Sequence, residues 1–175
     1  MTLGSPHRAV LGIAGWSGAG KTTLIEGVMP HLRTAGLSVS TIKHTHHGVD
    51  LDRPGKDSWR HREAGAQEVL IAGAGRWALL HEEPGLEPDL AALLPRLSPV
   101  DLVLVEGFRR YGVPKLEVFR PALGKPPLWP DWPDVAAIAS DASVPGCDRP
   151  VLDLSRLGEI ATWIMSFVQS TIAKP

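Results

Sequence analysis

A glycine-rich octapeptide at residues 15–22, GWSGAGKT, contains the residue types that bind nucleotide phosphates. It matches the pattern G-x-x-x-x-G-K-[ST] at every fixed position. Gly15, Gly18 and Gly20 can adopt backbone angles that turn successive N–H groups inward, forming a concave anion site at the start of a helix. The sequence therefore predicts a binding site for a nucleoside triphosphate.

The side chains of this loop predict how the triphosphate and a magnesium ion are held. Lys21 would reach the β- and γ-phosphates as a point charge, and the Thr22 hydroxyl would bind Mg²⁺. We expect Thr23 to contact the α-phosphate, and the predicted binding set also includes Ser17 and Ala19. The alternative is a glycine-rich turn with a lysine facing solvent. It is disfavoured because the loop lies between an apolar strand and an amphipathic helix.

A carboxylate on a second strand is needed to complete a magnesium site of this kind. Glu106 ends the strand-like run DLVLVE, and ligands of parallel α/β sheets lie beyond the carboxyl ends of the strands. We therefore predict that Glu106 and Thr22 hold the metal and that Lys21 and Glu106 are the catalytic residues. A loop acid without a ligand is the alternative for Glu106. Asp101 begins the same run and is expected to be structural.

Three other aspartates are candidates for the site. Asp141 follows the run VAAIAS and could accept hydrogen bonds from the N1–H and 2-amine of guanine, groups that adenine lacks. A turn or helix-cap role is the alternative. Asp50 and Asp52 follow the second predicted strand, and either could approach the metal or be an ordinary solvated loop acid.

Three histidines, His44, His46 and His47, leave the second predicted strand towards the expected nucleotide. Their imidazoles could contact phosphate or bind a transition metal. The metal interpretation is weak because neither cysteine nor a fixed H-x3-H spacing accompanies them. Polar loop packing is the alternative.

Alternating strand-like and helix-like segments must position these residues. The predicted strands of a mostly parallel sheet are Ala9–Ala14, Ser38–His44, Asp101–Glu106, Lys115–Phe119 and Val135–Ser140. Helices are predicted from Lys21 to the stop at Gly36, with a kink at Pro30, over Asp57–Ala64 and Asp89–Leu97, and after Ser155. The pattern indicates an α/β fold, a three-layer sandwich of the P-loop NTPase type. We expect one nucleotide-binding domain over residues 1–175.

Two segments depart from that alternation. A protruding β-hairpin is predicted for Glu68–Ala72 and Trp77–His81, so the G-x-G-x-x-A pattern from residue 73 is not a dinucleotide fingerprint. Residues 121–133 contain five prolines, which favours an extended surface segment. Its Trp129 and Trp132 are expected to pack over the core, with partner contacts as the alternative.

Composition limits the partners. The formal charge is −1 and the pI is about 6.6, so no basic excess supports nucleic-acid binding. The single cysteine, Cys147, excludes an intramolecular disulfide and suits the reducing cytoplasm. The N-terminal apolar run is too short for a membrane span. We predict a cytoplasmic protein without nucleic-acid or membrane partners.

Seven segments in order, GWSGAGKTTL, IKHTHH, DRPGKDS, REAGA, RWALLHE, LVEGF and KLEVFR, resemble the molybdopterin-guanine dinucleotide biosynthesis protein B family. The resemblance covers most of residues 10–141. It implies a GTP- and Mg²⁺-binding adaptor with slow GTPase activity at most. It also implies assistance to a molybdopterin guanylyltransferase (a MobA-like protein) and a homodimer built partly through an extended sheet. If the family's site residues are transferred position by position, Gly18, Gly20, Lys21 and Thr22 would hold phosphate and metal. Glu106 would occupy the family's acidic position.

Two other functions use the same triphosphate site. A P-loop small-molecule kinase would bring cations onto the transferred phosphate, and Arg109 and Arg110 lie close to Glu106 in sequence. A GTP-dependent metal-insertion protein would use His44, His46 and His47. The sequence lacks N-K-x-D, the guanine-reading signature of regulatory GTPases.

Overall fold

The computed structural model describes residues 7–45, 52–83, 85, 88–108 and 111–172. The chain divides into two compact units, one formed by Met1–His44 with Asp89–Pro175 and the other by Thr45–Pro88. The single domain expected over residues 1–175 stays a prediction. No helix in the described part of the chain is both long and apolar enough to cross a membrane.

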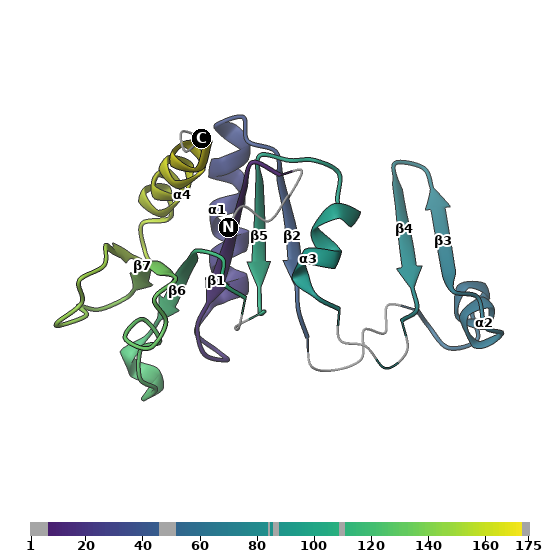
Figure 1. The fold of residues 1–175 in the computed structure, drawn as a ribbon, viewed down its shortest axis with the longest axis horizontal. Coiled ribbons are helices and arrows are strands. Elements are labelled where there is room, and N and C mark those ends of the chain that lie inside the picture. The colour runs from purple at the N-terminus through teal and green to yellow at the C-terminus, as the bar shows by residue number, and fades with distance from the viewer. Residues whose placement is uncertain (1–6, 46–51, 84, 86–87, 109–110, 173–175) are drawn as a thin grey trace. The chain divides into compact units, whose positions relative to one another are not determined.

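The first unit is built on a six-stranded parallel sheet (Figure 1). Its strand order is β2-β5-β1-β6-β7-β8, so β1 lies inside the sheet between β5 and β6. The strands are β1 (Ala9–Ala14), β2 (Val39–Lys43), β5 (Leu102–Glu106), β6 (Lys115–Phe119), β7 (Val135–Ser140) and β8 (Val151–Asp153). The predicted parallel α/β sheet is confirmed. We did not predict β8, because three residues at a sheet edge leave little periodic pattern.

Two long helices cover one face of this sheet. They are α1 (Lys21–Thr34) and α4 (Leu157–Ile172), and their apolar residues share one core with alternate residues of the strands, such as Leu102 and Leu104 of β5. Pro30 lies inside α1, which continues through it as one helix, and the kink expected there stays a prediction. This packing fixes the start of α1 against the sheet.

Shorter elements cover the opposite face. The helix α3 (Leu90–Leu93) continues as a 3-10 turn, η1 (Leu94–Arg96), and packs on Val103 and Val105 of β5. The expected longer α-helix changes type here because Pro95 has no N–H to continue the ladder. Trp129 and Trp132 pack against a buried cluster of β6 and β7 residues, so their predicted core packing is confirmed. The three predicted layers are therefore present.

Two buried charged residues on β6 attach the proline-rich segment to the sheet. Lys115 pairs with Asp134, and its ammonium also donates to the carbonyl of Val113 at 3.1 Å. Glu117 is fully buried and accepts hydrogen bonds from the N–H groups of Leu128 at 2.7 Å and Trp129 at 3.0 Å. Burial raises the pKa of Glu117, and these two hydrogen bonds oppose that shift. The segment, which begins with a 3-10 turn, η2 (Pro121–Leu123), is thus anchored by specific bonds.

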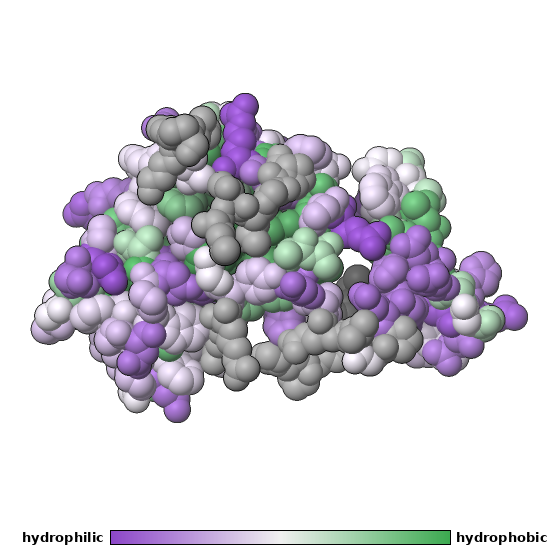
Figure 2. Space-filling model, viewed as in Figure 1, coloured by the Kyte–Doolittle hydropathy of each residue, from purple (hydrophilic) through white to green (hydrophobic). Residues whose placement is uncertain are grey.

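The second unit contains α2 (Asp57–Glu63) and an antiparallel hairpin of β3 (Glu68–Gly73) and β4 (Arg76–His81). Gly73 pairs with Arg76, so only two residues form the turn, and Gly75 has a φ of 75°. The predicted hairpin is confirmed, and the glycines serve its turn. The register places Leu70, Trp77 and Leu79 on one face, with 61%, 66% and 44% exposure. Figure 2 shows hydrophobic surface over this hairpin.

Candidate functional site

The phosphate loop joins the end of β1 at Ala14 to the start of α1 at Lys21. Gly15, Gly18 and Gly20 have φ angles of 138°, 80° and 97°, which residues with a Cβ rarely adopt. A Cβ on Gly15 would also lie only 2.5 Å from the carbonyl oxygen of Val118. The first turn of α1 contains no acidic residue, so its N–H groups form an uncancelled positive end. The loop therefore has the backbone conformation expected of an anion site.

Lys21 lies across this loop. Its ammonium donates to the carbonyl oxygens of Gly15 at 3.1 Å and Trp16 at 3.0 Å. Ser17 and Gly18 are exposed at the loop's tip, whereas Ala19 is buried beneath it. The positive charge and the exposed backbone therefore lie on the same short stretch of chain.

Thr22 and Glu106, the two predicted metal ligands, are brought together by the sheet. The Thr22 hydroxyl donates to both carboxylate oxygens of Glu106, at 3.2 and 3.1 Å. Glu106 ends β5 opposite Ile13 of β1, and its side chain is 13% exposed. Lys43 lies 3.9 Å from the same carboxylate. Hydroxyl and carboxylate oxygens beside an anion site suit Mg²⁺, which prefers oxygen ligands and substrate phosphates.

Gly107 and Phe108 shape the chain after Glu106. Gly107 has a φ of 98°, and a Cβ there would lie 2.7 Å from the Cβ of His44. The His44 ring packs against Phe108 with a centroid distance of 4.6 Å, and the backbone N–H of His44 donates to the backbone carbonyl of Glu106 at 2.8 Å. This agrees with the loop-packing interpretation of His44.

Several other candidates lie outside the described residues, namely His46, His47, Asp50, Arg109 and Arg110. Among the residues whose placement is described, no group of three or more His, Cys, Asp or Glu side chains could hold a metal ion.

Asp52 has a structural role within the second unit. Its carboxylate accepts from the Ser58 hydroxyl at 3.2 Å and from Nε of Arg62 at 2.9 Å, and its side chain is 3% exposed. Arg62 also pairs with Glu82 at 2.7 Å, and these bonds raise the pKa of its guanidinium. Asp52 is therefore not the solvated loop acid that we considered. Its bonds fasten the chain before α2 to that helix, and Arg62 connects the helix to Glu82, directly after β4.

Asp101 lies at the other end of β5 and is structural, as expected. It accepts from the N–H of Ser38 at 2.9 Å and from its hydroxyl at 2.6 Å, and it pairs with Arg8 at 2.7 Å. The two bonds from Ser38 are the main reason that the pKa of Asp101 is lowered.

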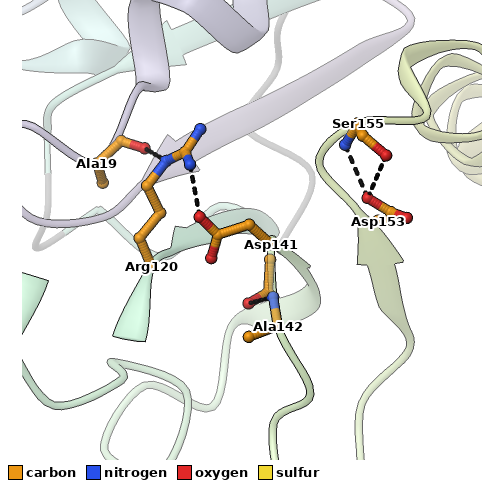
Figure 3. Close-up of polar contacts among 7 residues, drawn as sticks. Ala19, Arg120, Asp141, Ala142, Asp153 and Ser155 are labelled. Atoms are coloured by element: carbon orange, nitrogen blue, oxygen red, sulfur yellow. Dashed lines mark hydrogen bonds and ion pairs between the residues drawn. The ribbon is translucent and has the colours of Figure 1, made fainter. Parts of the chain in front are cut away.

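Arg120 is a site residue that the sequence analysis missed. Its Nε donates to the carbonyl of Ala19 at 3.0 Å, and its Nη1 donates to the Asp141 carboxylate at 2.5 Å (Figure 3). Arg120 thereby connects the phosphate loop to the aspartate predicted to read the base. The available signal was its place directly after β6, a strand that pairs with β1.

Trp16 is a second missed residue. Its indole N–H donates to the carbonyl of Pro126 at 2.8 Å, and Lys125 lies 5.7 Å from the centre of its ring. The phosphate loop therefore contacts the proline-rich segment directly. Sequence reasoning could not find this contact, because it joins residues 110 positions apart at a variable position of the motif.

A glycine-rich loop between an inner strand of a parallel sheet and the helix that follows defines an α/β protein of the P-loop fold class. Comparison with known families makes the assignment specific. Residues 10–141 match the family MobB, described as "Molybdopterin guanine dinucleotide synthesis protein B". The chain belongs to this family, and the resemblance seen in the sequence is confirmed.

Individual relatives agree with this assignment. The chain is 41% identical over 165 residues to the "Molybdopterin-guanine dinucleotide biosynthesis adapter protein" of Escherichia coli (strain K12), covering 91% of this chain and 93% of the relative. A protein of the same name from Haemophilus influenzae is 40% identical over 161 residues, covering 91% and 89%. A solved structure, "Crystal Structure of molybdopterin-guanine biosynthesis protein B (mobB)", superposes with a TM-score of 0.74 at 32% identity, covering 91% and 99%.

Proposed function

We propose that this protein is an adapter of molybdopterin guanine dinucleotide biosynthesis that binds GTP and Mg²⁺ at the GWSGAGKT loop. The curated relatives from two bacteria are named as adapter proteins of this pathway. The observation that carries the nucleotide proposal is the contact between Thr22 and Glu106 beside the phosphate loop. It unites a hydroxyl and a carboxylate from distant parts of the chain at the positive end of α1.

Each group has a defined part in this proposal. The loop N–H groups and the Lys21 ammonium bind phosphate oxygens, and Thr23 contacts the α-phosphate. Thr22 and Glu106 hold Mg²⁺, which would neutralise phosphate charge. Asp141 contacts the guanine base. Hydrolysis is slow at most, and the catalytic roles of Lys21 and Glu106 are to position the phosphates and the metal.

The proposed partners are a molybdopterin guanylyltransferase (a MobA-like protein) and a second copy of this chain. The exposed face formed by Leu70, Trp77 and Leu79 supports a homodimer, because contiguous exposed apolar side chains mark protein contacts. The free cysteine Cys147 agrees with the predicted cytoplasmic location.

Calorimetric titration with GTP and ATP, with and without Mg²⁺, tests the nucleotide part of the proposal. We expect micromolar, Mg²⁺-dependent GTP binding and weaker ATP binding. The adapter part is tested by adding the protein to a guanylyltransferase with molybdopterin and GTP, where it should increase formation of the dinucleotide. Tight ATP binding with γ-phosphate transfer to a metabolite would instead indicate a kinase. Stoichiometric bound nickel or zinc would indicate metal insertion.

A further inference from the structure

Lys125 is an exposed cation beside the phosphate loop. Its ammonium lies 5.7 Å from the centre of the ring of Trp16, the second residue of that loop. Lys43 and Arg120, two other cations at this edge of the sheet, each pair with a carboxylate. Lys125, in contrast, makes no hydrogen bond or ion pair with any residue that the structure describes. Its charge is therefore available for a ligand.

The proline-rich segment holds the backbone of Lys125 in place. The carbonyl of Pro126, the next residue, accepts a hydrogen bond from the indole N–H of Trp16 at 2.8 Å. Buried Glu117 accepts from two backbone N–H groups a little further along the segment. The segment follows β6, which is parallel to β1, so it leaves the sheet at the same edge as the phosphate loop (Figure 1). Lys125 thus combines an anchored backbone with a flexible four-carbon stem.

The contacts of Lys21 indicate which end of a bound triphosphate would lie near Trp16. In loops of this pattern the lysine ammonium reaches the β- and γ-phosphates. The Lys21 ammonium lies 3.0 Å from the carbonyl oxygen of Trp16 and 3.1 Å from that of Gly15. A γ-phosphate held by this ammonium would therefore lie next to the backbone of Trp16, and Lys125 lies over the ring of the same residue.

A second cation at this end has a larger effect on a triphosphate than on a diphosphate. A terminal phosphate group carries a charge of about −1.5 to −2 at pH 7. A diphosphate in the same loop ends at the β-position, where the N–H groups at the start of α1 bind it. The position beside Trp16 is then not filled by phosphate. A cation there can therefore distinguish the two kinds of nucleotide.

We propose that Lys125 contacts the terminal phosphate and thereby makes the site prefer GTP over GDP. Trp16 and Pro126 are positioning residues, because their hydrogen bond places Lys125 beside the loop. When the terminal phosphate is bound, its ion pair with Lys125 attaches the proline-rich segment to the ligand as well as to the loop. This inference rests on the proposed binding of GTP and adds a specificity-determining residue outside the glycine-rich motif.

Titration with GTP and GDP in the presence of Mg²⁺ tests this role. Lys125→Gln removes the charge and keeps a polar side chain. It should weaken GTP binding roughly fivefold, the size of an exposed ion pair, and leave GDP binding unchanged. Lys125→Arg keeps the charge and should retain the preference of the unmodified protein for GTP. The control, Arg33→Gln, removes a charge about 18 Å along α1 from Lys21, beyond the screening length, and should alter neither affinity.

Inorganic tripolyphosphate separates this effect from any contact with the nucleoside. It has three phosphates but neither base nor sugar, so Lys125→Gln should weaken its binding by the same factor as that of GTP. The loss should become smaller as the sodium chloride concentration rises, because salt screens exposed charges. A loss confined to GTP would show that Lys125 contacts the nucleoside, and it would overturn the proposal.

Trp16→Phe tests the positioning contact. Phenylalanine keeps an aromatic ring but has no N–H to donate to the carbonyl of Pro126. The substitution should lower the ratio of GTP affinity to GDP affinity. It should lower that ratio less when Lys125→Gln is already present, because substitutions of residues in contact are not additive. Equal effects in the two backgrounds would exclude Trp16 as a positioning residue for Lys125.

The outcomes of the nucleotide titration are distinguishable. Equal weakening of GTP and GDP binding by Lys125→Gln, or unchanged GTP binding, would overturn the role of Lys125 while the triphosphate site stands. Equal affinity of the unmodified protein for GTP and GDP would overturn it as well. Failure of the unmodified protein to bind GTP, GDP or tripolyphosphate would contradict the proposed function itself.

Discussion

Thr22 and Glu106 are 84 residues apart in the sequence, yet the Thr22 hydroxyl donates to both oxygens of the Glu106 carboxylate. The contact follows from sheet topology. Because β5 pairs with β1 in parallel and Glu106 lies opposite Ile13, both residues are at the carboxyl edge of the sheet. The first turn of α1 then places Thr22 above that edge.

Glu106→Gln tests the metal part of the site. The amide keeps the size of the side chain and can still accept from Thr22, but it is a weaker ligand for Mg²⁺. We expect the Mg²⁺-dependent affinity for GTP to fall by roughly tenfold, or about 1.4 kcal/mol, with the Mg²⁺-free affinity unchanged. Calorimetric titration with and without Mg²⁺ measures this. Asp101→Asn, at the opposite end of β5, should leave GTP affinity unaltered.

Lys21→Ala tests the phosphate loop. Removal of the ammonium takes away the charge that the loop positions over its own carbonyl oxygens. We expect a loss of GTP and tripolyphosphate affinity of roughly a hundredfold or more, about 2.7 kcal/mol. The control, Lys56→Ala, removes an exposed lysine of the second unit. Its affinities for GTP and for tripolyphosphate should equal those of the unmodified protein. Retained binding to Lys21→Ala would show that the triphosphate binds elsewhere.

Gly107→Ala tests whether the close approach of Gly107 to His44 contributes to stability. Gly107 has a positive φ, and a Cβ at this position would lie 2.7 Å from the Cβ of His44. Gly55→Ala is the matched control, since Gly55 has a φ of 84° but no atom within 4 Å of the added Cβ. Strain alone costs about 1–3 kcal/mol, and we expect Gly107→Ala to lower the free energy of unfolding by more than the control does. Denaturant titration measures both, and equal losses would mean that the close approach of His44 has no energetic consequence.

Glu117 gives a prediction for pH dependence. Burial raises its folded pKa, so the folded state holds the proton to higher pH than the unfolded state, whose pKa is near the ordinary value of 4.5. Its contribution to the free energy of unfolding therefore falls as pH rises from about that value through the raised folded pKa. Glu117→Gln cannot titrate at this position. The free energy of unfolding of the unmodified protein, minus that of the variant, should therefore decrease as pH rises over this window. Denaturant titrations at a series of pH values check this, and a difference that grows with pH would contradict it.

Trp77→Ser tests the proposed homodimer. The substitution removes the most exposed apolar side chain of the hairpin face shared with Leu70 and Leu79. We expect the molar mass measured by light scattering to fall from dimer to monomer. Leu123→Ser, which removes an exposed leucine of the first unit, should leave the mass unchanged. A monomeric unmodified protein would rule out this interface.

Local sequence determined the fold class, the phosphate loop and the identity of the family. The glycines at 15, 18 and 20 and the apolar runs beside them act within a few residues, so their pattern predicts the loop's conformation without long-range information. Glu106 could be chosen because parallel strands end at one edge, although its contact with Thr22 required the observed register. The short strand β8 and the 3-10 turn at Pro95 were missed because periodic patterns are weak in elements of three or four residues.

Only the tertiary structure decided the long-range polar contacts. Arg120 joins Ala19 to Asp141 because β6 pairs with both β1 and β7, and Trp16 contacts Pro126 because buried Glu117 fixes the proline-rich segment. The sequence contains each of these residues, but a hydrogen bond depends on positions within a few tenths of an ångström. Those positions are set by the packing of the whole sheet.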